Sequence, residues 1–393
     1  MKTMKWKFYS LAFVAGMSIL TACSSDDNND NDGNDGNGNG NEIENGTILK
    51  GTITSDVTLA AGNTYKLSGE YIVEEGATLH IEEGVKIIAV YDDIADYILV
   101  KQGGKINAVG TPDKPIVMTS EKEGPGAWGG IHICGRAHTN AEGGKGSSEI
   151  GGAVYGGNDD ADNSGTLQYI RLEYTGFAFD EEHEANGISF YGVGNGTIVD
   201  HCQAYKGSDD GFEFFGGSVN VSNLVAVSCS DDSFDWTEGW NGKGTNLVAY
   251  QEDKSTLGYD CDCLMECDNN GSNNAATPVA HPVLKNLILV GNGGSKQGIR
   301  LRAGTEVEID NAKVCGKGQP LTVETALTEN ALKNGTSKLT NITLTSELSS
   351  KEGIYTHADF IAVTSNKVDA NLSYSSFEDI RKECSWMNGS WVK

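Results

Sequence analysis

The chain has 393 residues, with 29 Lys and Arg against 55 Asp and Glu, which gives a formal net charge of −26 at pH 7. This charge repels nucleic-acid phosphates and anionic lipid headgroups, so it excludes nucleic acid as a partner and membrane binding through basic residues. The 51 glycines, 6 prolines and 38% hydrophobic residues exclude collagen and wholesale disorder, and they favour an all-β chain of short strands and tight turns.

A lipoprotein signal peptide is predicted over residues 1–22. Three lysines within the first seven residues precede an apolar run over residues 11–20, which is the order of a secretory signal. The run is too short to span a bilayer comfortably. It ends in Leu20-Thr21-Ala22-Cys23, which resembles a bacterial lipobox. The resemblance implies cleavage before Cys23 and attachment of lipid, palmitate included, to this cysteine.

Residues 23–45 are predicted to form an acidic tether. Residues 24–30 (SSDDNND) resemble the export signal that follows the lipidated cysteine in Bacteroidetes lipoproteins. This resemblance implies the outer membrane, with the protein exposed at the cell surface. The chain then contains only Asn, Asp and Gly as far as about Asn41, and such a composition cannot bury a core. A solvated linker without an export signal is the alternative.

Residues 46–330 are predicted to form a single-stranded right-handed parallel β-helix, followed by a less regular C-terminal cap over residues 331–393. Residues 71–87 alternate apolar and polar side chains and are interrupted by Glu-Gly turns. The run SDDGFEF over residues 208–214 recurs 22 residues later as SDDSFDW. This period suits one coil of a β-helix and predicts that Phe190, Phe214 and Trp236 stack inside it.

Over residues 46–320 the chain resembles an uncharacterised family of Bacteroidetes secreted and lipid-anchored β-helix proteins. The passages that carry the resemblance lie at residues 129–131, 155–160, 163–169 and 209–217. The family implies a fold and a location but no activity. Because surface lipoproteins of this phylum often accompany TonB-dependent importers, the resemblance also implies nutrient capture with a TonB-dependent receptor as partner.

Carboxylates from the repeated motif are the first candidate metal ligands. One coil apart, the spacing places the following residues over one another in pairs: Asp209 and Asp231, Asp210 and Asp232, Glu213 and Asp235. Carboxylates this close repel each other, and three outcomes relieve the repulsion: a retained proton, a bridging cation, or turns that splay them into water. Calcium is the expected cation because it prefers oxygen ligands and is available outside cells.

A second candidate calcium site is the run Asp160-Ala161-Asp162-Asn163-Ser164-Gly165. It resembles the first half of a calcium-binding loop, in which carboxylates alternate before a glycine, and the ligands would be Asp160 and Asp162. Arg171 stands where such a loop has a glutamate, so Glu173 would have to replace it. An Asx-turn before a strand is the alternative. The insertion over residues 179–184 (FDEEHE) is a further candidate for a transition metal, with a solvated loop as its alternative.

The cysteines leave two interpretations open. Eight follow Cys23, an even number that permits disulfides outside the cytoplasm. The Cys-x-Cys-x3-Cys run at residues 261–267 lacks a second cysteine pair at zinc spacing and a nearby histidine, which disfavours a zinc site. Buried thiols in a β-core are the alternative.

Three functions fit these features. The first is a non-catalytic binding module for an extended ligand such as a glycan, with sugar rings stacking on Trp128, Trp240, Trp386 or Trp391. The second is an enzyme of the β-helix type: a glycoside hydrolase with Asp209 and Asp210 as the acid and base, or a polysaccharide lyase with Arg300 or Lys296 as a candidate base. The third is an adhesin or structural surface protein. A β-helix fold alone does not choose between them.

Overall fold

The computed structural model describes residues 41–92, 94–179 and 183–393. The predicted signal peptide, Cys23 and most of the predicted tether lie outside the described residues. Within the described residues, no helix is both long enough and apolar enough to cross a membrane.

The described chain is mostly strand, with few helices. The strands are β1 Asn41–Glu42, β2 Ile48–Ile53, β3 Val57–Leu59, β4 Thr64–Val73, β5 Thr78–Ile81, β6 Lys86–Ala89, β7 Tyr97–Val100, β8 Lys105–Val109, β9 Ile116–Ser120, β10 Ile131–Cys134, β11 Gly146–Ser147, β12 Val154–Tyr155, β13 Gly165–Glu173, β14 Ile188–Tyr191, β15 Ile198–Tyr205, β16 Phe212–Phe215, β17 Asn220–Val227, β18 Phe234–Thr237, β19 Lys243–Tyr250, β20 Met265–Cys267, β21 Val283–Val290, β22 Gln297–Leu301, β23 Glu308–Cys315, β24 Gln319–Val323, β25 Lys338–Leu344, β26 Ser349–Ser350 and β27 Lys367–Val368. The helices are η1 Glu142–Gly144, α1 Lys254–Leu257, α2 Ala326–Asn334, α3 His357–Ala362, α4 Phe377–Glu383 and η2 Ser385–Met387.

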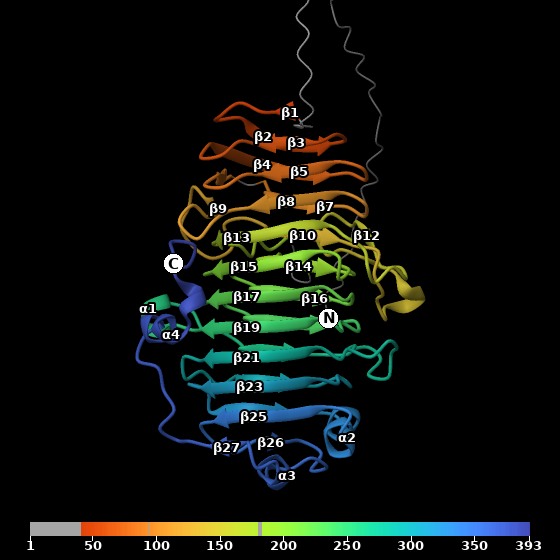
Figure 1. The fold of residues 1–393 in the computed structure, drawn as a ribbon, viewed down its shortest axis with the longest axis vertical. Coiled ribbons are helices and arrows are strands. Elements are labelled where there is room, and N and C mark those ends of the chain that lie inside the picture. The colour runs from red at the N-terminus through yellow and green to blue at the C-terminus, as the bar shows by residue number, and fades with distance from the viewer. Residues whose placement is uncertain (1–40, 93, 180–182) are drawn as a thin grey trace, which may run out of the picture. The chain divides into compact units, whose positions relative to one another are not determined.

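All strands except the β11–β12 hairpin belong to one parallel sheet that winds into a β-helix (Figure 1). One stack runs β14–β16–β18–β20–β22–β24 and another runs β13–β15–β17–β19–β21–β23–β25, so each strand pairs with its equivalent in the next coil. The predicted right-handed parallel β-helix is confirmed. The coils continue beyond residue 330, because β25 still pairs with β23. They also begin before residue 46, because Asn41 and Glu42 of β1 pair with β3.

The predicted register of the repeat is also confirmed. Glu213 of β16 lies beside Asp235 of β18, and Phe214 lies beside Trp236. Inside the coils the rings of Phe190 and Phe214 stack with centroids 5.0 Å apart. The continuation of this stack differs from the expectation, because the ring next to Phe214 is Trp240, at 4.2 Å, and Trp236 packs tilted against Trp240.

A row of asparagines forms the corner at which the long strands bend between two faces of the coil. Asn223, Asn246, Asn286, Asn311 and Asn341 all have φ between 55° and 63°, a left-handed conformation that asparagine tolerates better than most residues. Their amides bond from coil to coil, with Asn246, Asn286 and Asn311 each donating to the preceding asparagine at 2.8–3.0 Å. The side-chain amides at the bend therefore hydrogen-bond to one another.

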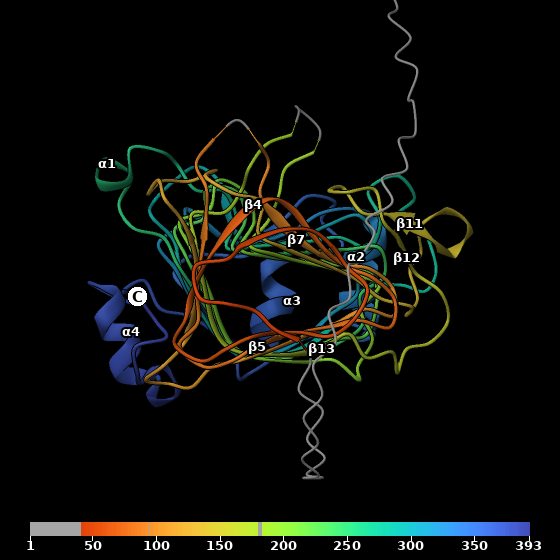
Figure 2. The same ribbon diagram turned by 90° about the horizontal axis from the view of Figure 1, so that it is seen from above.

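The last described residues close one end of the stack and then cover one flank. α3 lies across the end of the coils (Figures 1 and 2), and its Phe360 is fully buried in the core. After β27 the chain returns along the outside, where Ile380, Met387 and Trp391 pack on Val225, Val248 and other outward side chains of β17–β23. The C-terminal segment thus buries an apolar face that the coils leave open.

The asparagine corner generates a stability prediction at Asn223. Its amide donates to Asp200 at 2.7 Å and accepts from Asn246 at 2.8 Å. Asn223→Ala should lower the free energy of unfolding by about 3–4 kcal/mol, with about 1 for each of the two hydrogen bonds and about 1–2 for a left-handed alanine. Asn223→Gly should lose less, because glycine adopts this φ freely.

Thermal unfolding of both variants measures the difference. Asn371→Ala is the matched control, since Asn371 is exposed. Equal losses in the alanine and glycine variants would mean that the left-handed backbone at this corner carries no cost.

Candidate metal centre

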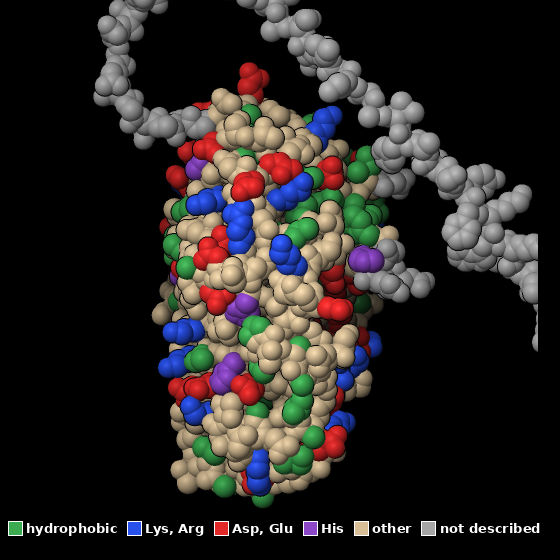
Figure 3. All heavy atoms as spheres, turned by 90° about the vertical axis from the view of Figure 1, so that its right-hand side faces the viewer, with side chains coloured by type: hydrophobic (Ala, Val, Ile, Leu, Met, Phe, Trp, Pro, Cys, Tyr) green, Lys and Arg blue, Asp and Glu red, His purple; other side chains and the backbone are tan. Residues whose placement is uncertain are grey.

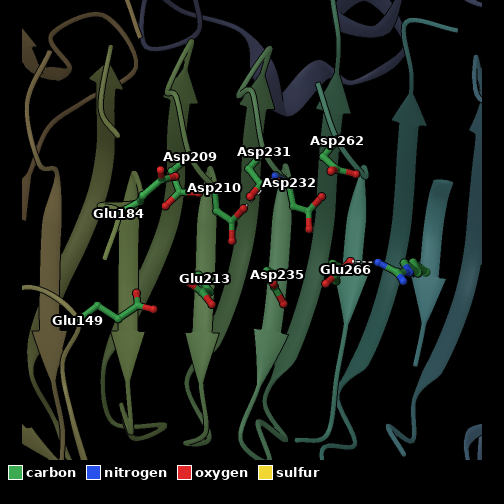
Figure 4. Close-up of a pocket in the computed structure, with 11 residues that line it drawn as sticks. Glu149, Glu184, Asp209, Asp210, Glu213, Asp231, Asp232, Asp235, Asp262 and Glu266 are labelled. Atoms are coloured by element: carbon green, nitrogen blue, oxygen red, sulfur yellow. Dashed lines mark hydrogen bonds and ion pairs between the residues drawn. The ribbon is translucent and has the colours of Figure 1, made fainter. Parts of the chain in front are cut away.

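An acidic groove of about 410 Å³ opens on the outer side of β16, β18 and β20. Figure 4 shows its carboxylates converging in two rows that run from coil to coil. Elsewhere the charges are mixed, and Figure 3 shows basic and acidic side chains interspersed over one face. Ten carboxylates and one guanidinium line the groove: Glu149, Glu184, Asp209, Asp210, Glu213, Asp231, Asp232, Asp235, Asp262, Glu266 and Arg300.

The upper row comes from the Ser-Asp-Asp turns, which hydrogen bonds lock to one another across the coils. The carboxylate of Asp210 accepts from the backbone N–H of Asp232 at 2.8 Å, and Asp232 accepts from the N–H of Cys263 at 2.6 Å. Gly211 permits this close stacking, because a Cβ there would lie 2.6 Å from the carbonyl oxygen of Ser233. These contacts hold the turns in register, and they hold the acidic side chains of the turns in register as well.

The lower row lies on the strands themselves. Glu213, Asp235 and Glu266 occupy equivalent positions of β16, β18 and β20, so they stand side by side at one strand spacing. Their neighbours in sequence point into the core, which turns these three side chains outward. Glu149 and Glu184 reach the groove from segments inserted between the coils.

The six carboxylates of the first two coils differ in exposure: Asp210 and Asp232 are buried, Asp231 is exposed, and the other three are half-buried. Asp210 and Asp232 are only 6% and 5% exposed, and the Oδ1 atom of Asp235 is buried with no hydrogen-bond partner. Burial, followed by repulsion from neighbouring carboxylates, raises the pKa of Asp209 to about 7 and of Asp231 to about 6. The same causes raise the pKa of the other four repeat carboxylates well above the usual range.

The third coil is different, because basic side chains neutralise it. Arg300 donates to Glu266 at 2.8 Å and to Glu324 at 3.3 Å, while Arg302 contacts Glu266 and Asp268, and Lys296 pairs with Asp262. Among the described residues that line the groove, Arg300 is the only base. No basic side chain in the described part of the groove lining therefore forms an ion pair with the carboxylates on the coils of β16 and β18.

Four sets of three donor atoms lie close enough to share a cation. The members of each set are within 4.8 Å of one another: Asp209, Asp210 and Asp231; Asp210, Glu213 and Asp235; Asp232, Asp235 and Glu266; Asp232, Asp262 and Cys263. Consecutive sets share Asp210, Asp235 or Asp232. The groove therefore offers a chain of overlapping sites in which single carboxylates could bridge two cations.

All six repeat carboxylates predicted as metal ligands meet in this groove, but the sequence prediction left out several of its members. Asp262 belongs to a third coil in which the motif has changed to DCLMEC. Asn186 was missed as well; it is 1% exposed, donates to Glu213 at 2.6 Å, and leaves its own Oδ1 buried without a partner. The fit of Leu264-Met265-Glu266 to the repeat indicates Glu266 as the next member of the lower row, and the structure places it there.

The second predicted site is separate from the groove. Asp160 accepts hydrogen bonds from the backbone and the ring of His138, and Asp162 accepts from the N–H of Arg136. Asn163 accepts from the N–H of Gly165, which is an Asx-turn. Among the described residues, Asp160 and Asp162 join no set of three close metal donors. Glu184 of the 179–184 insertion enters the groove, whereas residues 180–182 lie outside the described residues.

The eight cysteines after Cys23 are all free and buried. This is the buried-thiol alternative rather than a set of disulfides. Cys263 alone stands among metal donors, with Asp232 and Asp262.

Comparison with known proteins agrees with the fold. A family described as pectate-lyase like beta helix domain matches residues 51–392, and the chain belongs to this family. No curated protein and no solved structure matches the chain.

The groove carboxylates predict an unusual pH dependence. The folded-state pKa of Asp209, about 7, lies above the unfolded value of about 3.9, so the folded protein keeps a proton that the unfolded chain releases. This contribution to stability is complete below the unfolded pKa and is lost as pH rises through the folded pKa. In chelator, the melting temperature should therefore fall between about pH 4 and pH 8.

The double variant Asp209→Asn/Asp231→Asn should make this slope shallower, because two of the six groups stop titrating. Differential scanning calorimetry across the pH range makes the measurement. A wild-type melting temperature that rises toward pH 8 in chelator would contradict the prediction.

Proposed function

We propose that this chain is a calcium-stabilised, non-catalytic binding module that is anchored to the outer membrane through Cys23 and exposed at the cell surface. Its ligand is an extended molecule such as a glycan. The observation that carries the proposal is the set of six unneutralised carboxylates on two adjacent coils, one of which, Asp235, has a buried oxygen without a partner.

Calcium fits the donor set of this groove. It takes six to eight oxygen ligands in flexible geometry. Three of the four sets supply three oxygen donors each, from the carboxylates of the first two coils and Glu266, whereas the fourth includes the sulfur of Cys263. The remaining positions are open to water or to the oxygens of a ligand. A cation held here would offset the repulsion between coils and present positive charge in a chain that otherwise repels anions.

A binding role is favoured over the lyase alternative by the state of the candidate bases. Arg300 is engaged by Glu266 and Glu324, and hydrogen bonds and attraction from these carboxylates raise its pKa. Lys296 is paired with Asp262, and this contact raises the pKa of its ammonium group. Both groups therefore hold their protons more tightly than usual, which is the opposite of what a general base needs.

The location rests on the predicted lipobox and on the acidic run after Cys23. A TonB-dependent receptor is the proposed partner, and nutrient capture is the role that such a pairing serves. These features make the protein a peripheral, lipid-held component of the membrane.

Calcium binding is tested by stability. The wild-type melting temperature should rise with calcium and fall with chelator. A calcium concentration a hundred times the dissociation constant should add about 2.7 kcal/mol to the free energy of unfolding. Asp209→Asn/Asp231→Asn should reduce the rise, because it removes two donors of one set, while leaving the calcium-free protein no less stable, because like charges repel in the absence of calcium. If calcium has no effect on the wild type and the double variant is simply less stable, the aspartates are turn formers.

Calorimetric titration adds a finer comparison within the groove. Asp235 belongs to two of the four donor sets and Asp209 to one. Asp235→Asn should therefore reduce calcium binding more than Asp209→Asn. Equal effects would contradict bridging by Asp235 without contradicting calcium binding.

The anchor is tested separately. Cys23→Ala should release the protein from the membrane fraction of its native host, because no lipid can attach. Unchanged fractionation would overturn the lipoprotein proposal. Added protease should trim the wild type on intact cells, whereas full protection would place it in the periplasm.

A further inference from the structure

A second cavity, of about 320 Å³, lies on a different part of the coils, between the asparagine corner and the C-terminal segment. One side is lined by the adjacent strands β19, β21 and β23, and the other by the end of α4 and by η2. Its volume is at the lower end of the range for small-molecule sites, roughly 300–1,000 Å³. Its polar and aromatic lining includes Asn246, Asn286, Asn311, Lys313, Glu383 and Trp386.

The first notable feature is a row of three amides. Asn246, Asn286 and Asn311 each use one N–H to bond the preceding asparagine. A carboxamide has two N–H donors and a carbonyl oxygen with two lone pairs. Each amide can therefore still donate one hydrogen bond, and the carbonyls can accept more. The row repeats at the strand spacing of about 4.8 Å.

The second feature is an aromatic surface. Among the four tryptophans predicted to stack on sugars, Trp128, Trp240 and Trp391 are at most 1% exposed and belong to the core clusters. Trp386 is only partly buried, at the edge of its cluster, and it lines the cavity. It packs against Trp391, with ring centroids 6.2 Å apart. The indole is thus held in place while part of it stays accessible.

The third feature is charge balance. Lys313 and Glu383 form an ion pair at 2.5 Å on the wall of the cavity, and its other side chains are uncharged. The net charge of the lining is zero, in contrast to the acidic groove. A charged ligand would have to break this pair or remain uncompensated, and a neutral ligand avoids both costs.

We propose that this cavity binds one or two rings of a neutral saccharide. A sugar ring has a face of C–H groups that stacks on an indole, and hydroxyls that both donate and accept, as the free amide positions do. The binding does not depend on calcium, so it goes beyond the role proposed for the acidic groove. Together the two sites would give the module separate contacts with one extended glycan.

The test is calorimetric titration of the wild-type chain, in chelator, with cellohexaose, xylohexaose, mannohexaose and maltohexaose. At least one should bind, with a blue shift of tryptophan fluorescence as indole leaves water. Trp386→Ala should weaken this binding at least tenfold, and Trp386→Phe should retain more of it because a smaller aromatic face remains. Tyr91→Ala is the matched control, since Tyr91 is 53% exposed and lies outside the cavity.

Melting curves distinguish a loss of binding from a loss of folding. This control is needed because Trp386 also covers part of the flank. A Trp386→Ala protein that melts like the wild type and loses binding supports the proposal. If that variant unfolds early, Ser385→Trp, which fills the mouth of the cavity while keeping Trp386, should also abolish binding. The proposal is overturned if none of the four oligosaccharides binds at about 10 mM, or if Trp386→Ala binds as well as the wild type.

Discussion

The stacking of parallel strands places equivalent residues of adjacent coils one strand spacing apart, about 4.8 Å. When equivalent positions hold the same residue type, identical side chains therefore lie next to each other in adjacent coils. For asparagine this is favourable, because an amide donates to the copy on one side and accepts from the copy on the other. For aspartate and glutamate it is unfavourable, because no arrangement of carboxylates alone pairs their charges. The corner at Asn246 and the groove at Asp235 are opposite results of one geometric constraint.

The two features divide structural and functional roles across the coil. Coils already held together by core rings and by the asparagine corner can tolerate repulsion at a third position. Side chains that weaken a fold without a ligand are those for which a ligand-dependent role is the simplest explanation. The basic residues of the next coil, Arg300 and Lys296, show how the chain neutralises such a row where it is not left open.

The sequence predicted the fold and six groove residues because the motif at 208–214 recurs without an insertion. The spacing of 22 residues then sets the register, and the strand period decides which side chains point outward. The prediction failed where insertions change the spacing. The bonded asparagines are separated by 23, 40 and 25 residues, so no fixed period reveals them. Glu149 and Glu184 enter the groove, and Asn186 donates to Glu213, from insertions or turns whose paths only the folded coils define.

The returning C-terminal segment has a consequence for how the coils come apart. In a stack where each repeat touches only its neighbours, unfolding can begin at an end and proceed one repeat at a time. Here Ile380, Met387 and Trp391 contact side chains from several coils at once. Fraying of those coils must first detach the segment, which links them into one cooperative block. Mechanical force applied along the stack would then meet its main resistance at the contacts of the C-terminal segment with the flank, rather than at successive coil interfaces.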